Sequence, residues 1–220
     1  HCISSAASEV YKRQALGTEV TIISRSQLLR QLDPDLAEPF NKLAAERYTV
    51  HMGRTVTSAT EDSEGITLTL DDGTTVSSES LLIATGRIPN SDTLDVAAAG
   101  IETHEGGRVA VDEFGRTSVD GVWSLGDLSS PYQLKHVANA EQRAVTHNVL
   151  KAWAGNDDSA MVPMPHDHVP SAIFTHPQIA TVGMTEQEAV DAGFDVTVKV
   201  QNYGDVAYGW GLEDLSLIHI

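Results

Sequence analysis

The sequence predicts an α/β fold, and three observations support this class. Residues 122–125 (VWSL) form a short apolar run bounded by turn residues, as is typical of a buried strand. Apolar residues then recur with helical spacing from Leu134 to Ala152, which predicts a helix of about four or five turns. Earlier, residues 19–24 (EVTIIS) have a strand pattern and precede a second helical segment. With 220 residues, 41% of them hydrophobic, the chain can bury a core in one domain or two.

The chain is strongly acidic. Lys and Arg number 14 against 31 Asp and Glu, so the formal net charge is 14 − 31 = −17. Such a surface repels phosphates, which argues against nucleic acid and anionic membranes as partners. No apolar run is as long as a transmembrane helix and no signal peptide opens the sequence, so we expect a cytoplasmic protein. Cys2 is the single cysteine, which excludes an internal disulfide and a Cys-x-x-Cys site.

The first elements are expected after residue 14. Residues 1–14 show no coherent element, and we expect this segment to be foreign to the rest of the chain. Gly17 is placed to cap the end of a helix, directly before the strand at residues 19–24.

A helix is expected from Asp33 to about Arg47. Asp is a favoured cap residue, and Pro34 is tolerated at the first helical position. Pro39 should bend this helix or delay its start.

Strand patterns follow at residues 55–60, 65–70 and 74–76. The turn at residues 71–73 (DDG) makes the last two a hairpin. Residues 81–84 (LLIA) are then expected to form a buried strand that ends before Gly86.

The second half of the chain alternates short elements with loops. Before the strand at 122–125 we expect a short amphipathic element at residues 94–101 and an edge strand at 109–112; a polar boundary loop at 154–161 follows the long helix. Further on, residues 179–183 and 196–200 have strand patterns. Between them, Thr185 and Glu188 form a capping box that opens a helix.

Gly126 and Asp127 come where the strand at 122–125 ends and before the long helix begins. Glycine lets the backbone approach a ligand, and a carboxylate accepts hydrogen bonds from sugar-type hydroxyls. The start of the following helix offers N–H groups and a positive dipole end to an electron-rich atom. This arrangement suits a dinucleotide, although Gly-Asp after a strand also occurs in ordinary turns.

Three motifs together carry a family resemblance. They are LLIATGRIPN at residues 81–90, the strand ending in Gly126-Asp127, and IFTHP at residues 173–177. In this order they resemble the flavin-dependent disulfide reductases, the pyridine nucleotide-disulfide oxidoreductases of the glutathione reductase type. Residues 131–139 (PYQLKHVAN) and 203–210 (YGDVAYGW) are most similar to the mycothione reductase branch. The resemblance covers roughly residues 15–214, the middle of a family member, and residues 215–220 depart from it.

The resemblance implies a domain plan. Residues 1–86 would be part of a Rossmann-like NADPH-binding domain, residues 87–160 the second segment of an FAD-binding domain, and residues 161–220 part of an α+β dimerisation domain. The intact protein would then be a homodimer, and this chain an internal part of it with non-native ends.

The resemblance also implies residues that bind FAD. The Asp127 carboxylate would hydrogen-bond the ribityl chain, and the alternative is an ordinary loop aspartate. The backbone N–H of Lys135 would face the flavin ring, where the helix terminus stabilises negative charge. Arg87 would anchor the turn between domains. The cofactor-binding residues implied in this part of the chain are Asp127, Gly126, Lys135, Leu134, Gln133 and Gly86.

Arg25 and Arg30 follow the strand at residues 19–24. In a nicotinamide-binding domain an acidic residue at this place favours NAD, whereas arginines accommodate the 2′-phosphate of NADP. The sequence therefore favours NADPH over NADH. The alternative is a pair of ordinary surface arginines.

The histidines offer weaker candidates. His136, at the start of the long helix, could be a general base, but a structural role is the preferred interpretation. His166 and His168 have a spacing compatible with zinc, yet the loop composition around them favours solvated side chains and no metal site. By resemblance His176 belongs to the dimerisation domain and is not the catalytic histidine of the family.

The resemblance implies an NADPH- and FAD-dependent disulfide reductase. Hydride would pass from NADPH through FAD to a redox disulfide and then to a low-molecular-weight disulfide such as mycothione. The family's cysteine pair and its first Gly-x-Gly-x-x-Gly loop do not occur, and His176-Pro177 is not the family's catalytic His-Pro pair, which lies nearer its C-terminus. No catalytic residue is therefore assigned, and the chain alone is expected to be inactive. Alternatives are a dihydrolipoamide dehydrogenase-like or mercuric reductase-like flavoenzyme, or a non-catalytic flavin- or nucleotide-binding module.

Overall fold

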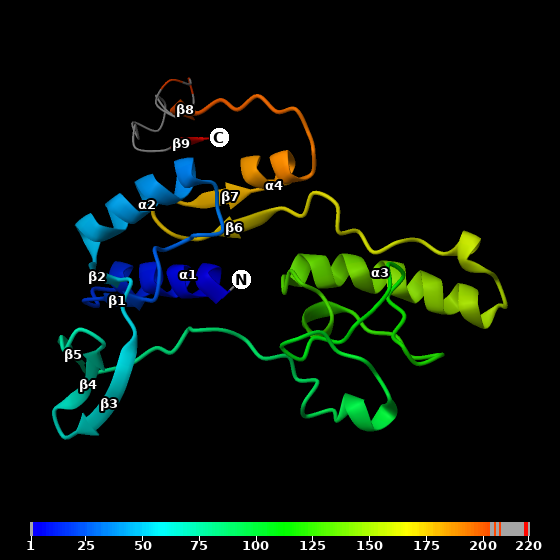
Figure 1. The fold of residues 1–220 in the computed structure, drawn as a ribbon, viewed down its shortest axis with the longest axis horizontal. Coiled ribbons are helices and arrows are strands. Elements are labelled where there is room, and N and C mark those ends of the chain that lie inside the picture. The colour runs from blue at the N-terminus through cyan, green and yellow to red at the C-terminus, as the bar shows by residue number, and fades with distance from the viewer. Residues whose placement is uncertain (1, 203–204, 206, 208–217, 220) are drawn as a thin grey trace. The chain divides into compact units, whose positions relative to one another are not determined.

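The computed structural model describes residues 2–202, 205, 207, 218 and 219, and it confirms the mixed α/β class (Figure 1). The chain divides into two compact units. One is Gly86–Val169, and the other joins Cys2–Thr85 with Pro170–Ile220. The chain therefore leaves the second unit at Gly86 and returns to it after Val169.

Helix α1, Cys2–Ala15, occupies the segment for which no element was expected, so that expectation was wrong. The segment has no acidic residue in its first turn, which removes a usual signal of a helix start. The helix ends as predicted: Gly17 has a φ of 89°, and the Thr18 N–H donates to the Arg13 carbonyl at 3.1 Å.

A strand–helix–strand unit follows. Strand β1, Thr21–Ser24, confirms the strand expected at 19–24, with tighter bounds. Helix α2, Pro34–Arg47, begins at the predicted proline and leads to β2, Thr49–Met52, a strand that was not predicted. β1 and β2 pair in parallel, as the connection by a helix requires.

Helix α2 differs from expectation in two details. Pro39 lies inside the helix, which continues through it. The Asp33 side chain does not cap α2; its Oδ1 accepts the Glu186 N–H at 3.0 Å instead. Asp33 thus links the starts of two helices of the same unit.

The next three strands form an antiparallel sheet in the order β3-β4-β5. They are β3, Val56–Asp62, β4, Gly65–Leu70, and β5, Thr75–Ser78. The predicted hairpin is confirmed, because β4 and β5 pair across the turn and the Leu70 N–H donates to the Thr74 carbonyl at 2.8 Å.

Residues 81–84 are not a strand, and Leu81, Leu82 and Ile83 are exposed. The expectation of a buried strand was wrong. An apolar run becomes a buried strand only where neighbouring strands and helices cover it. In the part of the chain that the structure describes, β1 and β2 pair only with each other.

The unit Gly86–Val169 is built on helix α3, Lys135–Trp153, which confirms the long helix. Short 3-10 helices lie in two of the segments expected to be irregular or short: η1, Val96–Ala99, and η3, Asp158–Ala160. A third, η2, Gly126–Leu128, carries the Gly-Asp pair.

Two strands expected in this unit are not formed, so those expectations were wrong. Residues 109–112 and 122–125 contribute only isolated bridges, Thr103 with Val109 and Arg116 with Trp123. Val109 is nevertheless buried, so its apolar character reflects the interior rather than a strand. Extended segments here are fixed by single backbone hydrogen bonds, such as that from the Ser124 N–H to the Gly115 carbonyl at 3.0 Å.

The chain then completes the other unit. β6, Ser171–Ile173, and β7, Ile179–Thr181, pair antiparallel, and α4, Glu186–Asp191, begins with the predicted capping box. The capping box joins Thr185 and Glu188 in both directions.

Residues 196–200 are exposed and irregular, so the strand expected there was wrong. A pairing follows between β8, Gln201–Asn202, and β9, Ile218–His219. Of the motif at 203–210 only residues 205 and 207 are described, and residues 215–217 and 220 lie outside the described residues.

The buried cluster of the second unit joins α2 to the β6-β7 pair. Its members are Leu29, Phe40, Ala44, Ile173 and Ile179, with Leu28, Leu32, Leu36 and Tyr48 packed against them. Helix α2 and the β6-β7 pair, which are far apart in sequence, thus share one core. Among the described residues, no helix has both the length and the apolar character needed to span a bilayer.

Candidate functional site

The Gly126-Asp127 turn has a conformation that requires glycine. Gly126 has a φ of 68°, in the left-handed region, and it is buried. Its carbonyl accepts the N–H groups of Ser129 at 3.0 Å and Ser130 at 2.7 Å. The backbone therefore turns sharply at Gly126 and presents Asp127 outward.

The Asp127 carboxylate is exposed and paired. Arg87 Nη2 lies 2.6 Å from Asp127 Oδ2, and each side chain is 47% exposed. Arg87 Nη1 also donates to the Gln133 carbonyl at 3.5 Å. Sequence reasoning assigned Arg87 only to an inter-domain turn, and the structure adds that it joins two of the predicted site residues.

Helix α3 begins beside this group without a side-chain cap. Leu134 is the N-cap residue, in an extended conformation, and its side chain makes no capping hydrogen bond. Gln133, just before it, has a positive φ of 50°. Lys135 is exposed at the first helical position. An uncapped helix start is suited to an electron-rich ligand atom.

A buried carboxyl holds the turn from the helix side. Glu141 is 0% exposed, and its Oε2 accepts the Gly126 N–H at 2.7 Å. Its Oε1 lies 2.6 Å from His166 Nε2. The Tyr132 ring packs edge-on against His166, with centroids 5.1 Å apart, and its hydroxyl donates to the His166 carbonyl at 3.1 Å.

The interpretation of His166 as a solvated loop residue was therefore wrong. The sequence carried a signal that could have found the pair: Glu141 lies on the same helix face as the buried Val137, Ala144 and Asn148. A charged residue on an otherwise buried face needs a partner. His168, by contrast, is exposed in the loop, and no group of three metal-binding side chains exists among the described residues.

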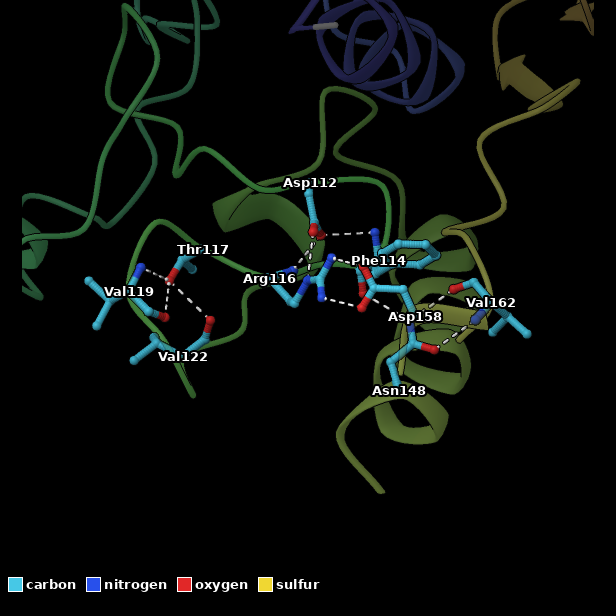
Figure 2. A network of polar contacts seen from close by, with 9 residues as sticks. All are labelled: Asp112, Phe114, Arg116, Thr117, Val119, Val122, Asn148, Asp158 and Val162. Atoms are coloured by element: carbon cyan, nitrogen blue, oxygen red, sulfur yellow. Dashed lines mark hydrogen bonds and ion pairs between the residues drawn. The ribbon is translucent and has the colours of Figure 1, made fainter. Parts of the chain in front are cut away.

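A second polar network fixes the loop that leads to the turn (Figure 2). Arg116 Nε donates to Asp112 at 2.7 Å, and its two terminal nitrogens donate to Asp158 at 2.7 and 3.0 Å. These hydrogen bonds, the one to Asp158 most of all, raise the pKa of Arg116, and they lower the pKa of Asp158. The network ties residues 112–116 to η3.

The remaining predicted residues make none of the contacts described at the turn. Gly86 is exposed and precedes Arg87 directly. Arg25 and Arg30 belong to the other unit, where both are exposed in the loop that follows β1. His136 is exposed in the first turn of α3.

The residues at the turn fit a polyhydroxylated nucleotide cofactor. An exposed carboxylate can accept hydroxyls, a buried glycine allows close approach, and the helix start is uncapped. In addition, the buried Ser124 and Ser129 hydroxyls find no hydrogen-bond partner among the described residues.

Comparison with known proteins identifies the same family. Residues 4–144 match the family described as "Pyridine nucleotide-disulphide oxidoreductase", and residues 169–216 match its dimerisation domain. The first match takes in most of residues 1–14, so the expectation that this segment is foreign was wrong from residue 4 onward.

Two curated relatives show how similarity is distributed. Mycothione reductase of Mycobacterium tuberculosis is 49% identical over 212 residues, covering 96% of this chain and 46% of the relative. Dihydrolipoyl dehydrogenase of Halobacterium salinarum is 35% identical over 189 residues, covering 83% of this chain and 38% of the relative. The chain spans about half the length of the mycothione reductase it matches.

A solved structure with a similar fold is LpdA from Mycobacterium tuberculosis. The TM-score is 0.83 at 24% identity, and the match covers 98% of this chain and 46% of that one. This likeness supports the fold, and the family match, which extends over more than half of the chain, supports the assignment. Membership implies flavin and pyridine nucleotide cofactors. The chain therefore belongs to the pyridine nucleotide-disulphide oxidoreductase family.

Proposed function

We propose that this chain supplies the Asp127 turn and the α3 terminus of a disulfide reductase that uses FAD and NADPH. The arrangement that carries the proposal is the exposed Asp127 carboxylate, paired with Arg87 at 2.6 Å and lying just before an uncapped helix. The unit Gly86–Val169 would be the second flavin segment, broadly as the boundaries 87–160 predict. Residues 161–220 would then belong to the dimer interface of the intact protein.

The residues of the turn would bind and orient the cofactor. Asp127 would accept hydroxyls of the ribityl chain, Arg87 fixes the direction of that carboxylate, and the Lys135 N–H would be the helix donor nearest the ring. The start of α3 stabilises negative charge near it. When bound, FAD supplies the hydride and electron-transfer chemistry that carries reducing equivalents from the nucleotide to a disulfide.

The similarity pattern favours a mycothione-type low-molecular-weight disulfide as substrate. Identity is 49% to a mycothione reductase and 35% to a dihydrolipoyl dehydrogenase, over comparable shares of this chain. The dihydrolipoamide dehydrogenase-like, mercuric reductase-like and non-catalytic alternatives would be favoured instead if the gene product that carries this chain did not consume NADPH with mycothiol disulfide.

Arg25 and Arg30 favour NADPH over NADH. Both are exposed in the loop after β1, where cationic side chains can meet the 2′-phosphate of the nucleotide. This part of the proposal fails if replacing both arginines by alanine weakens NADPH and NADH binding equally. The cytoplasmic location expected from the sequence stays a prediction.

Asp127→Asn tests the proposed flavin site. The amide cannot match the charged acceptor or the ion pair with Arg87, so we expect the dissociation constant of FAD to rise by roughly tenfold. Titration of flavin fluorescence at equilibrium measures it. The matched control is Asp120→Asn, an exposed carboxylate in a neighbouring turn. Equal FAD affinity in D127N, D120N and the unaltered chain would refute the proposal.

A further inference from the structure

Glu141 is a buried acidic residue that the proposed cofactor contacts leave unexplained. It is 0% exposed, on a helix face whose other buried members include Val137, Ala144 and Val145. A buried carboxyl is costly to desolvate, and an apolar residue of similar size is often at least as stabilising. Its presence therefore calls for a role other than filling the core.

The contacts of Glu141 divide between its two oxygens. Oε2 accepts the Gly126 N–H at 2.7 Å, and Oε1 lies 2.6 Å from His166 Nε2. His166 is itself held by Tyr132, through the ring contact and the hydrogen bond to its carbonyl. The carboxyl is thus fixed in direction before any ligand is present.

The group that Glu141 holds is the peptide N–H one residue before Asp127. That N–H belongs to the residue whose φ of 68° sets the turn. Ala138, one helical turn before Glu141, lies 3.5 Å from the position of a Cβ added to Gly126. Helix α3 therefore fixes the orientation of the turn through the hydrogen bond from Glu141, with Ala138 beside Gly126.

From this geometry we infer that Glu141, held by His166, is a positioning residue for the flavin carboxylate Asp127. The inference rests on the proposed function, because it assumes that Asp127 binds the ribityl chain. Glu141 would not touch the ligand; it holds the Gly126 N–H and so fixes the backbone from which Asp127, paired with Arg87, would meet the hydroxyls.

A double-mutant cycle on the 220-residue chain tests the inference with FAD as the probe. We expect Glu141→Ala to raise the dissociation constant of FAD by roughly tenfold, since the Gly126 N–H loses its acceptor. If Glu141 acts through Asp127, this effect should largely disappear in the D127N background. Glu141→Gln should restore most of the affinity, because its amide oxygen still accepts from Gly126 and its NH2 can donate to His166.

The matched control is Asn148→Ala. Asn148 is also 0% exposed on α3, and it makes three hydrogen bonds, to Phe114 and Val162, away from the turn. Both E141A and N148A should lower the melting temperature, but only E141A should weaken FAD. Hydrogen exchange adds a ligand-free readout: the Gly126 amide should exchange faster in E141A and stay protected in E141Q.

The outcomes separate the inference from the proposed function. If D127N itself leaves FAD affinity unchanged, the proposed flavin site fails. If D127N weakens FAD while E141A does not, or if the E141A and D127N effects simply add, the flavin site stands and the positioning role of Glu141 is overturned. A loss of FAD affinity in N148A equal to that in E141A would also overturn it, since general destabilisation would then explain both.

Discussion

At the scale of single residues, the proposed site combines side chains that the sequence singles out with partners that only the structure shows. Gly126 and Asp127 were singled out because a glycine and a carboxylate at a chain turn have recognisable chemistry. Their partners Arg87 and Glu141 are 40 and 15 residues away in sequence. Such partners are set by tertiary packing, which no local pattern records.

Gly115 offers a test of how tightly helix α3 packs against the loop at residues 112–116. It has a φ of 92°, and a Cβ added there would lie 2.6 Å from Val145 Cγ2. Gly121 has a φ of 74° with nothing near its added Cβ. We expect G121A to cost about 1 kcal/mol from backbone strain and G115A about 1–3 kcal/mol more from overpacking. Urea unfolding measures both, and equal losses would show that Val145 does not constrain Gly115.

Asp158 gives a prediction about pH. The hydrogen bonds from Arg116 hold the pKa of Asp158 below its ordinary value of 3.8 (Figure 2). A lowered pKa stabilises the folded chain above the ordinary value, and this contribution is lost as the pH falls through the folded one. Asp158→Asn should therefore melt below the unaltered chain at about pH 6, and the two melting temperatures should converge at a pH below the lowered pKa. Circular dichroism melts would contradict this if their difference were the same at both pH values.

At the scale of elements, local sequence signals predicted helices and turns well, whereas apolar runs predicted buried strands poorly. The long helix, the β4-β5 hairpin and the capping box at Thr185 were all found, because each depends on residues close in sequence. The expected strands at 81–84, 122–125 and 196–200 were wrong. An apolar run favours burial. Whether it forms a strand depends on a neighbouring strand to pair with, which is a property of the whole fold.

The capping box of α4 supplies the prediction at this scale. Thr185 accepts the Glu188 N–H at 3.3 Å, and the Glu188 side chain accepts the Thr185 N–H at 2.8 Å. We expect T185A to destabilise the chain by about 1 kcal/mol and T185S to be nearly neutral, because serine keeps the hydroxyl. Thermal unfolding and hydrogen exchange over Glu186–Asp191 measure the effect. Equal loss in T185A and T185S would assign it to the methyl group instead.

At the scale of the whole molecule, the chain carries the proposed cofactor turn but only one cysteine. Cys2 is the sole cysteine. One chain therefore cannot hold the pair of thiols that would pass two electrons to a substrate disulfide. We expect the 220-residue chain to show no disulfide reductase activity and to lose FAD on desalting. NADPH consumption with mycothiol disulfide is the assay, with the mycothione reductase of Mycobacterium tuberculosis as the positive control. Turnover by this chain alone would contradict the expectation.

The family and the α/β class could both be predicted from the sequence. The motifs can be recognised by their residues and order even where the strands expected around them are not formed. The position of Glu141 was not, although its place on a buried helix face could have raised the question. Motif order thus predicted the family, and the contacts that hold the Gly126-Asp127 turn in place came from the structure.

The ion pair between Arg87 and Asp127 also bears on selectivity. An unpaired carboxylate on a protein with a net charge of −17 would attract dissolved divalent cations. Here a guanidinium already lies 2.6 Å from it, so a divalent cation would have to displace a fixed positive charge. The neutral pair still offers lone pairs to uncharged hydroxyls. The same contact that orients the aspartate thus protects it from competition by dissolved metal ions.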